Sequence, residues 1–210
     1  MESASGLWGR HCPASIAEKK GKLVTWPAGY IKFPKMEMSD GDIAIRPLRF
    51  DDRESIRSWR NDQMDVLRQC EPLTESEQED YFNKEVRLSM LSESPDQMLL
   101  GMEEGNHLVA YGGLVNISWI NRRAELSFLA ATQLQSDKYE NYFLVFVNFV
   151  FDQAHNELGI HRIFTETYAF RRDHISLIER FGFKLEGRLV DHNYGLDGFF
   201  DSIVHGVILV

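Results

Sequence analysis

Glu125 is a candidate catalytic residue on a predicted strand. It stands in RRAELSFLAA, residues 122–131, whose pattern predicts a strand. A carboxylate held on a strand is a candidate general base, taking a proton directly or through a water molecule. Arg122 and Arg123 stand close by in the sequence, so a structural ion pair is the alternative role for this carboxylate.

His174 is the second candidate for proton transfer. It lies near the start of RRDHISLIERF, residues 171–181, which reads as an amphipathic helix. Imidazole titrates near neutral pH, so His174 is a candidate proton donor. The alternative is packing, because His174 and Ile178 are four residues apart and share one face of that helix.

The remaining histidines and the cysteines do not form a metal site in the sequence. His192 and His205 fall on adjacent predicted strands, but no third ligand accompanies them. Cys12 and Cys70 form neither a CxxC pair nor a zinc-ligand spacing. We therefore predict no metal, and free thiols in a reducing compartment.

The elements that must position Glu125 and His174 form a mixed α/β (α+β) order. Helix 141–158 is apolar almost all round, which predicts burial against a sheet. The flanking strands, 122–131 and 161–170, should be parallel neighbours, because an apolar helix joins them as a crossover connection. The other expected elements are a strand at 43–48, helices beginning at Asp51–Asp52 and after Thr74, a hairpin of 97–105 with 107–120, and a C-terminal hairpin turning at 196–198. The sequence thus predicts a central twisted mixed sheet flanked by helices.

The N-terminal part of the chain differs from the rest. Residues 1–22 are small and polar, whereas residues 23–38 alternate and contain two prolines, which suggests an arm or an edge strand. Residues 39–42 (SDGD) predict a turn. We expect a partly disordered N-terminal extension at residues 1–40, followed by one domain at residues 41–210.

Composition and charge limit the partners of the protein. The chain has 210 residues, 43% of them hydrophobic and 26% charged, which is typical of a globular domain. The net charge of −9 argues against binding of nucleic acid. The longest apolar run, residues 143–151, is too short to span a membrane, and residues 1–15 lack the apolar core of a signal peptide. These features predict a cytoplasmic protein without membrane or nucleic-acid partners.

Four stretches of the chain resemble the GCN5-related N-acetyltransferase (GNAT) superfamily. They are IAIRPLRFDDRESIRSWRND, GGLVNISWINRRAELSFLAA, GIHRIFTETYAF and LIERFGFKLEGRLVDHNYGLDGFFDSIVHGVI, and they cover about residues 43–210. The ERFGFKLEGRL stretch is similar to the branch of RimJ/RimL-type protein acetyltransferases. The WRN triplet is similar to nucleotide-sugar N-acetyltransferases.

The resemblance implies an acyl-CoA-dependent N-acyltransferase. Such an enzyme would transfer acetyl from acetyl-CoA to a primary amine of a small molecule, such as a nucleotide-linked amino sugar, or of a protein. In the family, the acetyl-CoA arm lies between two parallel strands that splay at their C-terminal ends. The resemblance then implies Glu125 and His174 as catalytic residues. It implies as cofactor-binding residues Leu126, Phe128, Gln135, Lys138, Arg171 and Arg172.

Three positions depart from the family pattern. The pyrophosphate loop of the family is rich in glycine, but residues 135–140 read QSDKYE, and no glycine occurs between residues 130 and 158. Arg171 or Arg172 stands where the family often has asparagine, and Ile178 stands where many members have a tyrosine acid. The alternative function is therefore a GNAT-fold binding or regulatory protein that has lost acetyl-CoA chemistry or uses another donor. A monomer and a homodimer are both consistent with the sequence.

Overall fold

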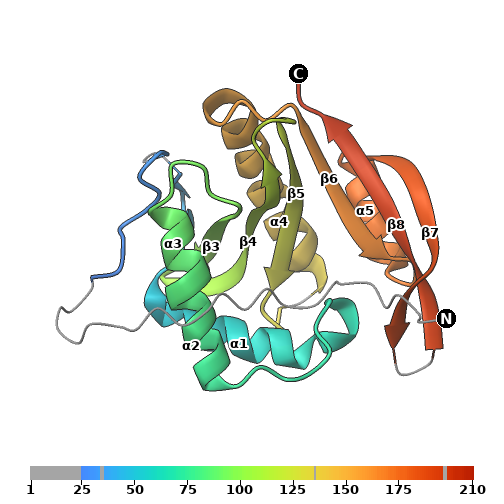
Figure 1. Cartoon of the computed structure of the whole chain (residues 1–210), viewed down its shortest axis with the longest axis horizontal. Helices are drawn as coiled ribbons and strands as arrows, with labels where there is room; N and C mark the ends of the chain where they lie inside the picture. The colour runs from blue at the N-terminus through green and yellow to red at the C-terminus, as the bar shows by residue number, and fades with distance from the viewer. Residues whose placement is uncertain (1–24, 34–35, 135, 196–197) are drawn as a thin grey trace, which may run out of the picture.

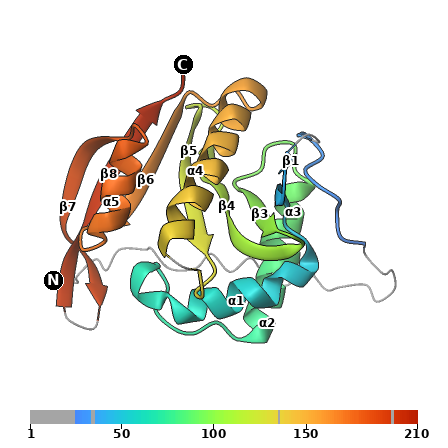
Figure 2. The same cartoon turned by 180° about the vertical axis from the view of Figure 1, so that it is seen from behind.

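One mixed sheet of eight strands organises the molecule, with helices on both of its faces (Figures 1 and 2). The computed structural model describes residues 25–33, 36–134, 136–195 and 198–210. The strand order is β1-β2-β3-β4-β5-β6-β8-β7. The strands are β1 (Met38–Asp40), β2 (Ile43–Pro47), β3 (Met98–Glu104), β4 (His107–Ser118), β5 (Arg123–Ala130), β6 (Arg162–Tyr168), β7 (Lys184–Gly195) and β8 (Gly198–Ile208). This architecture confirms the predicted fold class.

The helices are divided between the two faces of the sheet. Helices α2 and α3 lie in front of it in Figure 1, whereas α4 and α5 lie in front of it in the reversed view of Figure 2. The α-helices are α1 (Arg53–Asp62), α2 (Glu75–Tyr81), α3 (Arg87–Met90), α4 (Ser136–Asp152) and α5 (Arg172–Arg180). A π-helical turn, η3 (Phe82–Val86), joins α2 to α3, and a second one, η4 (Gln153–Glu157), extends α4.

Helix α2 begins where the sequence predicts. The backbone N–H of Glu77 donates to Thr74 Oγ1 at 3.2 Å, and the backbone N–H of Thr74 donates to the Glu77 carboxylate at 2.9 Å. This reciprocal pair is a capping box, which provides partners for two N–H groups that lack one within the helix.

Helix α4 is the buried helix that the sequence predicts, but its predicted start is wrong. It begins at Ser136 and not at residue 141. The sequence predicts a phosphate-binding loop at residues 135–140, whereas most of this stretch forms the first turn of the helix. The aromatic side chains of Phe143 and Phe146 are almost completely buried, and both pack against Phe128 of β5. This apolar contact fixes α4 on the sheet beside the end of β5.

The N-terminal arm packs on the domain where it is described. Tyr30 and Met36 are 2% exposed, and the Tyr30 hydroxyl donates to the carbonyl of Leu99 on β3 at 3.2 Å. Strand β1 pairs with β2, so the predicted turn at 39–42 is wrong in its first half, which is strand. Residues 1–24 lie outside the described residues, and the boundary after residue 40 stays a prediction.

The parallel strands β5 and β6 pair only at their beginnings. Their ladder has the pairs Arg123↔Arg162, Ala124↔Ile163 and Glu125↔Phe164, after which the strands diverge (Figure 1). Strand β6 instead pairs with β8 along its whole length. The prediction of parallel neighbours that splay at their C-terminal ends is confirmed. We call the space between the diverging strands the strand opening.

Two adjacent glycines keep β4 close to its neighbours. A Cβ atom on Gly112 would lie 2.1 Å from the carbonyl oxygen of Ser127, and one on Gly113 would lie 2.0 Å from that of Met98. Gly113 also has a φ of 137°. Side chains are excluded here, so the sheet next to the strand opening depends on both glycines.

Candidate active site

Glu125 occupies the last paired position before the strand opening. Glu125 is 7% exposed, and both oxygens of its carboxylate accept hydrogen bonds. Asn116 Nδ2 donates to Oε2 at 2.7 Å, and Arg68 Nη2 donates to Oε1 at 2.9 Å. The carboxylate is therefore held in one orientation at the edge of the opening, as a general base must be.

Asn116 reaches Glu125 because β4 is irregular at this point. The register between β4 and β5 shifts between Val115 and Ser118, and Asn116 has a φ of 50°. A bulge of this kind redirects a side chain that would otherwise follow the alternation of the strand. Sequence reasoning did not identify Asn116, because a strand asparagine gives no signal of a bulge.

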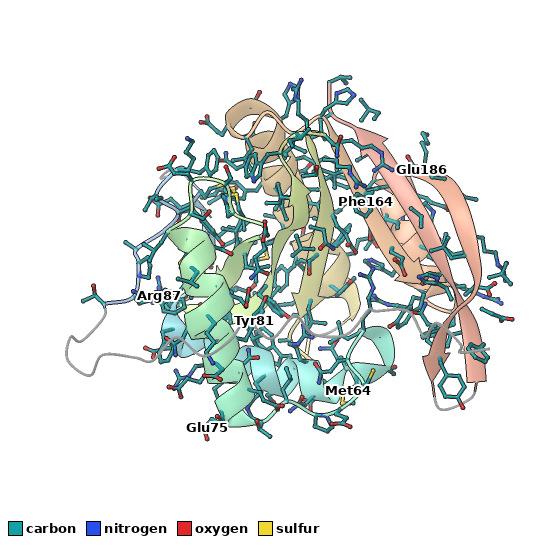
Figure 3. All side chains as sticks on the ribbon, viewed as in Figure 1. Met64, Glu75, Tyr81, Arg87, Phe164 and Glu186 are labelled. Carbon is teal, nitrogen blue, oxygen red and sulfur yellow. The ribbon has the colours of Figure 1, made fainter. Side chains whose placement is uncertain are left out.

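Arg68 connects the two diverging strands. It lies between η2 (Met64–Val66) and α2, in a segment that passes below the open ends of β5 and β6. Figure 3 labels Met64, in η2 just before this segment, and Phe164 on β6. Its Nη2 atom lies 2.9 Å from the Glu125 carboxylate and 3.3 Å from that of Glu166 on β6. One cationic nitrogen thus bridges carboxylates from both sides of the opening.

The ion pair expected for Glu125 exists, but with a different partner. Arg122 donates to the carbonyl of Gly159 at 2.6 Å, and the Arg123 guanidinium lies over the ring of Phe164. Neither is the partner of Glu125, which is Arg68, more than fifty residues away in the sequence. Loop residues carry no periodic pattern, so no sequence signal pointed to Arg68.

His174 lies on the other face of the sheet, against α4. Its Nδ1 is 3.1 Å from the hydroxyl of Tyr139, and its ring packs edge-on against Phe143. Burial, with the charges of Arg171 and His205, lowers the pKa of His174 to about 3. The imidazole is neutral at physiological pH, so the expectation that it titrates near neutral pH is wrong.

The two predicted catalytic residues do not meet on one face. Side chains alternate along a strand, so Glu125 and Phe128 point to opposite faces of β5. Phe128 packs on Tyr139, Phe143 and Phe146, so it faces α4. Glu125 therefore faces the side of α1 and α2, whereas His174 lies on the side of α4 and α5. A reaction at this site would have one reactant approaching from each side of the strand opening.

A hollow lies between the first turns of α4 and α5. Its volume is about 370 Å³. Two cations, Arg171 and Arg172, stand at its edge where α5 begins, and helix N-termini favour anions. Among the residues that the structure describes, the lining consists of Asp65, Val66, Tyr139, Phe170, Arg171, Arg172, Asp173 and His174. The structure brings Arg171, Arg172 and His174 together in this hollow, where Asp65 and Asp173 accompany the two arginines.

The edge of β5 beyond Glu125 suits an extended amide chain. The backbone N–H of Ala131 donates to Val109, which continues the β4 ladder, so by alternation the polar backbone groups of Leu126 and Phe128 point toward the strand opening. The ladder with β6 has ended there. This edge offers backbone groups to the pantetheine of acetyl-CoA. Arg171 and Arg172 of the hollow, which also contains Asp65 and Asp173, offer cations to its pyrophosphate.

One of the two predicted loop side chains, that of Lys138, does not join this arrangement. Lys138 points to the end of β3, where its Nζ lies 3.1 Å from the Glu104 carboxylate, and it is not among the residues that line the hollow. Lys138 therefore already has a carboxylate partner away from the site. Gln135 lies outside the described residues.

Comparison with known proteins identifies the family. A family model described as the acetyltransferase (GNAT) domain matches residues 45–204. The chain belongs to the GNAT acetyltransferase family. Its members are N-acetyltransferases that take the acetyl group from acetyl-CoA, which agrees with the fit of the β5 edge and the hollow. A search of curated proteins found no match.

Solved structures of GNAT enzymes share the fold. Spermidine N-acetyltransferase SpeG from Vibrio cholerae in complex with CoA and spermine has a TM-score of 0.71 at 21% identity, covering 81% of this chain and 97% of that chain. A dodecameric form of the V. cholerae enzyme in an intermediate state has a TM-score of 0.68 at 20% identity, covering 81% and 95%. At this identity the similarity shows the fold alone.

Two further kinds of site were sought in the described part of the chain. No helix there has both the length and the apolar character needed to cross a membrane. No group of three or more histidine, cysteine, aspartate or glutamate residues is arranged there to hold a metal ion.

Proposed function

We propose that this protein transfers the acetyl group of acetyl-CoA to the primary amine of a small, positively charged molecule. The observation that carries the proposal is the position of Glu125. It is a buried, oriented carboxylate at the point where β5 and β6 part. Membership of the GNAT family and the fit of the β5 edge support acetyl-CoA as the donor.

The donor would bind along β5 and in the hollow. Leu126 and Phe128 would hold the pantetheine amides through their backbone groups, and the phosphates would lie near Arg171, Arg172 and the first turns of α4 and α5. Bound in this way, acetyl-CoA supplies a thioester carbonyl. The residues of the chain orient that carbonyl beside the acceptor and exclude water from it.

The acceptor would be activated by Glu125. An ammonium group carries a positive charge and cannot attack a carbonyl, so Glu125 accepts one of its protons. The neutral amine nitrogen then bonds to the acetyl carbon, the bond between carbon and sulfur breaks, and the sulfur leaves with the electron pair. The bonded nitrogen then loses its second proton, which the leaving thiolate takes up directly or through water. His174, hydrogen-bonded to Tyr139, is neutral at physiological pH, and we propose that it positions Tyr139 on that face without donating a proton.

The charges on the acceptor side favour a cationic small molecule. The carboxylates of Glu125 and Glu166 both lie on this side, where each contacts Arg68. Three arginines of the first strand and helix are not free to bind an anion, since Arg46 and Arg49 are paired with carboxylates and Arg57 is paired with Glu54. A nucleotide-linked amino sugar, which carries phosphates, is therefore less well supported than a polyamine.

The experiment is an acetylation assay on the purified chain. Acetyl-CoA is incubated with spermidine, with monoamines and with a nucleotide-linked amino sugar, and product mass and thiol release are measured. Acetylated spermidine is the expected product. Calorimetry with acetyl-CoA provides the second measurement. If acetyl-CoA does not bind at millimolar concentration, the chain is a GNAT-fold binding protein and the proposed activity is wrong.

A further inference from the structure

Arg68 lies between two carboxylates that face the strand opening, those of Glu125 and Glu166. Its Nη2 atom is 2.9 Å from Glu125 and 3.3 Å from Glu166, so it contacts the proposed base and the facing strand at once. A substrate ammonium has the same charge and donates hydrogen bonds of the same kind. It could make the same two contacts only after Arg68 had left.

We propose that Arg68 is a displaceable gate: its guanidinium fills the acceptor-amine position in the free protein, and a cationic acceptor replaces it between Glu125 and Glu166. This proposal rests on the proposed function, and it deepens it by defining the acceptor as a cation that binds in exchange for another cation. Arg68 is a specificity-determining residue in this scheme, and it takes no part in the chemical step.

Burial of Glu125 makes the exchange selective. The side chain of Glu125 is 9% exposed, so removing its cationic partner would leave a charge that water solvates poorly. An incoming cation compensates that charge, whereas a neutral or anionic molecule does not. Glu166, whose side chain is 19% exposed, needs a cationic partner for the same reason.

The departure of Arg68 requires movement of a side chain and not of the loop. The Arg68 side chain is 49% exposed, so it can turn out into water by changing rotamer. The loop backbone beyond it is held by Asn61 of α1, whose side chain bonds both backbone groups of Leu73 at 2.8 and 2.9 Å. The same Asn61 accepts a hydrogen bond from Gln69 at 2.9 Å.

The alternative role for Arg68 is a purely structural partner of Glu125. The two roles predict different effects on acceptor affinity. If Arg68 competes with the acceptor, its removal increases the fraction of protein that can bind and lowers the KM for the amine. If Arg68 only supports Glu125, its removal frees no binding position, and the KM for the amine rises or stays unchanged.

The experiment compares Arg68→Ala with Arg68→Lys and with the wild type in spermidine acetylation. We expect Arg68→Ala to lower the KM for spermidine by about tenfold. Arg68→Lys keeps a cation in the gate and should keep KM near the wild-type value. Lys32→Ala, which removes an exposed ion pair with Glu93 on the N-terminal arm, is the control for loss of a cation elsewhere. A KM that rises or stays unchanged in Arg68→Ala overturns the gate.

Methylguanidinium tests whether the vacated position and the acceptor position are the same. This ion carries the head group of arginine, so it should inhibit Arg68→Ala competitively against spermidine and should not inhibit the wild type. Inhibition that is absent or not competitive with spermidine contradicts the proposal.

A binding measurement separates failure of the gate from failure of the proposed activity. Without acetyl-CoA, spermidine should raise the thermal midpoint of Arg68→Ala more than that of the wild type, and Arg68→Ala/Glu125→Gln should lose this gain. If no amine is acetylated but this shift is seen, the proposed activity is wrong and the gate stands. Equal shifts in the wild type and Arg68→Ala overturn the gate.

Discussion

The hydroxyl of Tyr139 and Nδ1 of His174 lie 3.1 Å apart, joining the first turns of α4 and α5. Both groups are neutral at physiological pH, because burial lowers the pKa of His174 to about 3 and raises that of Tyr139. A hydrogen bond between neutral partners holds the two helix starts together without adding charge to the hollow. Any phosphate bound there would meet the positive charges of Arg171 and Arg172 and the negative charges of Asp65 and Asp173.

The low pKa of His174 makes stability depend on pH. In the unfolded chain the imidazole has its usual pKa of 6.5, and in the folded chain the value is about 3. Between these values the unfolded state binds the extra proton, so the free energy of unfolding falls as pH falls below 6.5. The largest slope for one proton is about 1.4 kcal/mol per pH unit.

Replacement of His174 isolates this contribution. His174→Phe keeps an aromatic ring against Phe143 but cannot bind a proton. We expect its unfolding free energy to change less steeply between pH 6.5 and pH 5 than that of the wild type, as measured by urea denaturation. His161→Phe, at an exposed position, is the matched control. Parallel curves for the wild type and His174→Phe would contradict the assignment.

Loss of the proposed base should reduce turnover. Glu125→Gln retains the shape of the side chain and an oxygen for Asn116, but it cannot accept the proton of the acceptor. General-base catalysis contributes about 10²- to 10⁴-fold, so we expect kcat to fall within that range. The affinity for acetyl-CoA, measured by calorimetry, should remain close to wild type. The exposed Glu93→Gln is the control, and full activity in Glu125→Gln would exclude Glu125 as the base.

Acetyl-CoA affinity should distinguish the cations near α4. Arg172 lines the hollow, whereas Lys138 is paired with Glu104 outside it. Arg172→Ala should weaken acetyl-CoA binding by about tenfold or more, as expected for loss of one hydrogen bond to a charged group. Lys138→Ala should have little effect in the same calorimetric titration. The reverse ranking would show that the phosphates lie on the Lys138 side of α4.

The close approach of β4 to its neighbours gives a stability prediction. Alanine at Gly113 would place a Cβ atom 2.0 Å from the carbonyl oxygen of Met98, at a φ of 137°. Overpacking and backbone strain together should lower the unfolding free energy by about 3 kcal/mol or more. Gly187→Ala is the control, because a Cβ there meets no atom within 4 Å. Thermal midpoints that match in the two variants would contradict this account.

The fold was largely predictable because its signals are local and repeated. Alternation, capping residues and an apolar helix indicated the strands around Glu125 and the order of the elements. The resemblance to the GNAT superfamily added the splayed strands. The site was less predictable, since Arg68 and Asn116 depend on a loop and a bulge that only tertiary structure places beside Glu125. The environment of His174 likewise comes from burial by distant elements, so its pKa could not be inferred from its residue type.

The short ladder between β5 and β6 also has a mechanical consequence. It divides the sheet into two parts, which we call plates. One plate is formed by β1 to β5 and the other by β6, β8 and β7, and the two plates share only the three residue pairs of this ladder, which we call the seam. A donor bound along that seam would touch both plates and act as a clamp across them. Amide hydrogens at the seam, including those of Ala124 and Phe164, should then exchange with solvent more slowly when acetyl-CoA is bound. The same seam is where the plates would separate first when the empty protein is pulled or warmed.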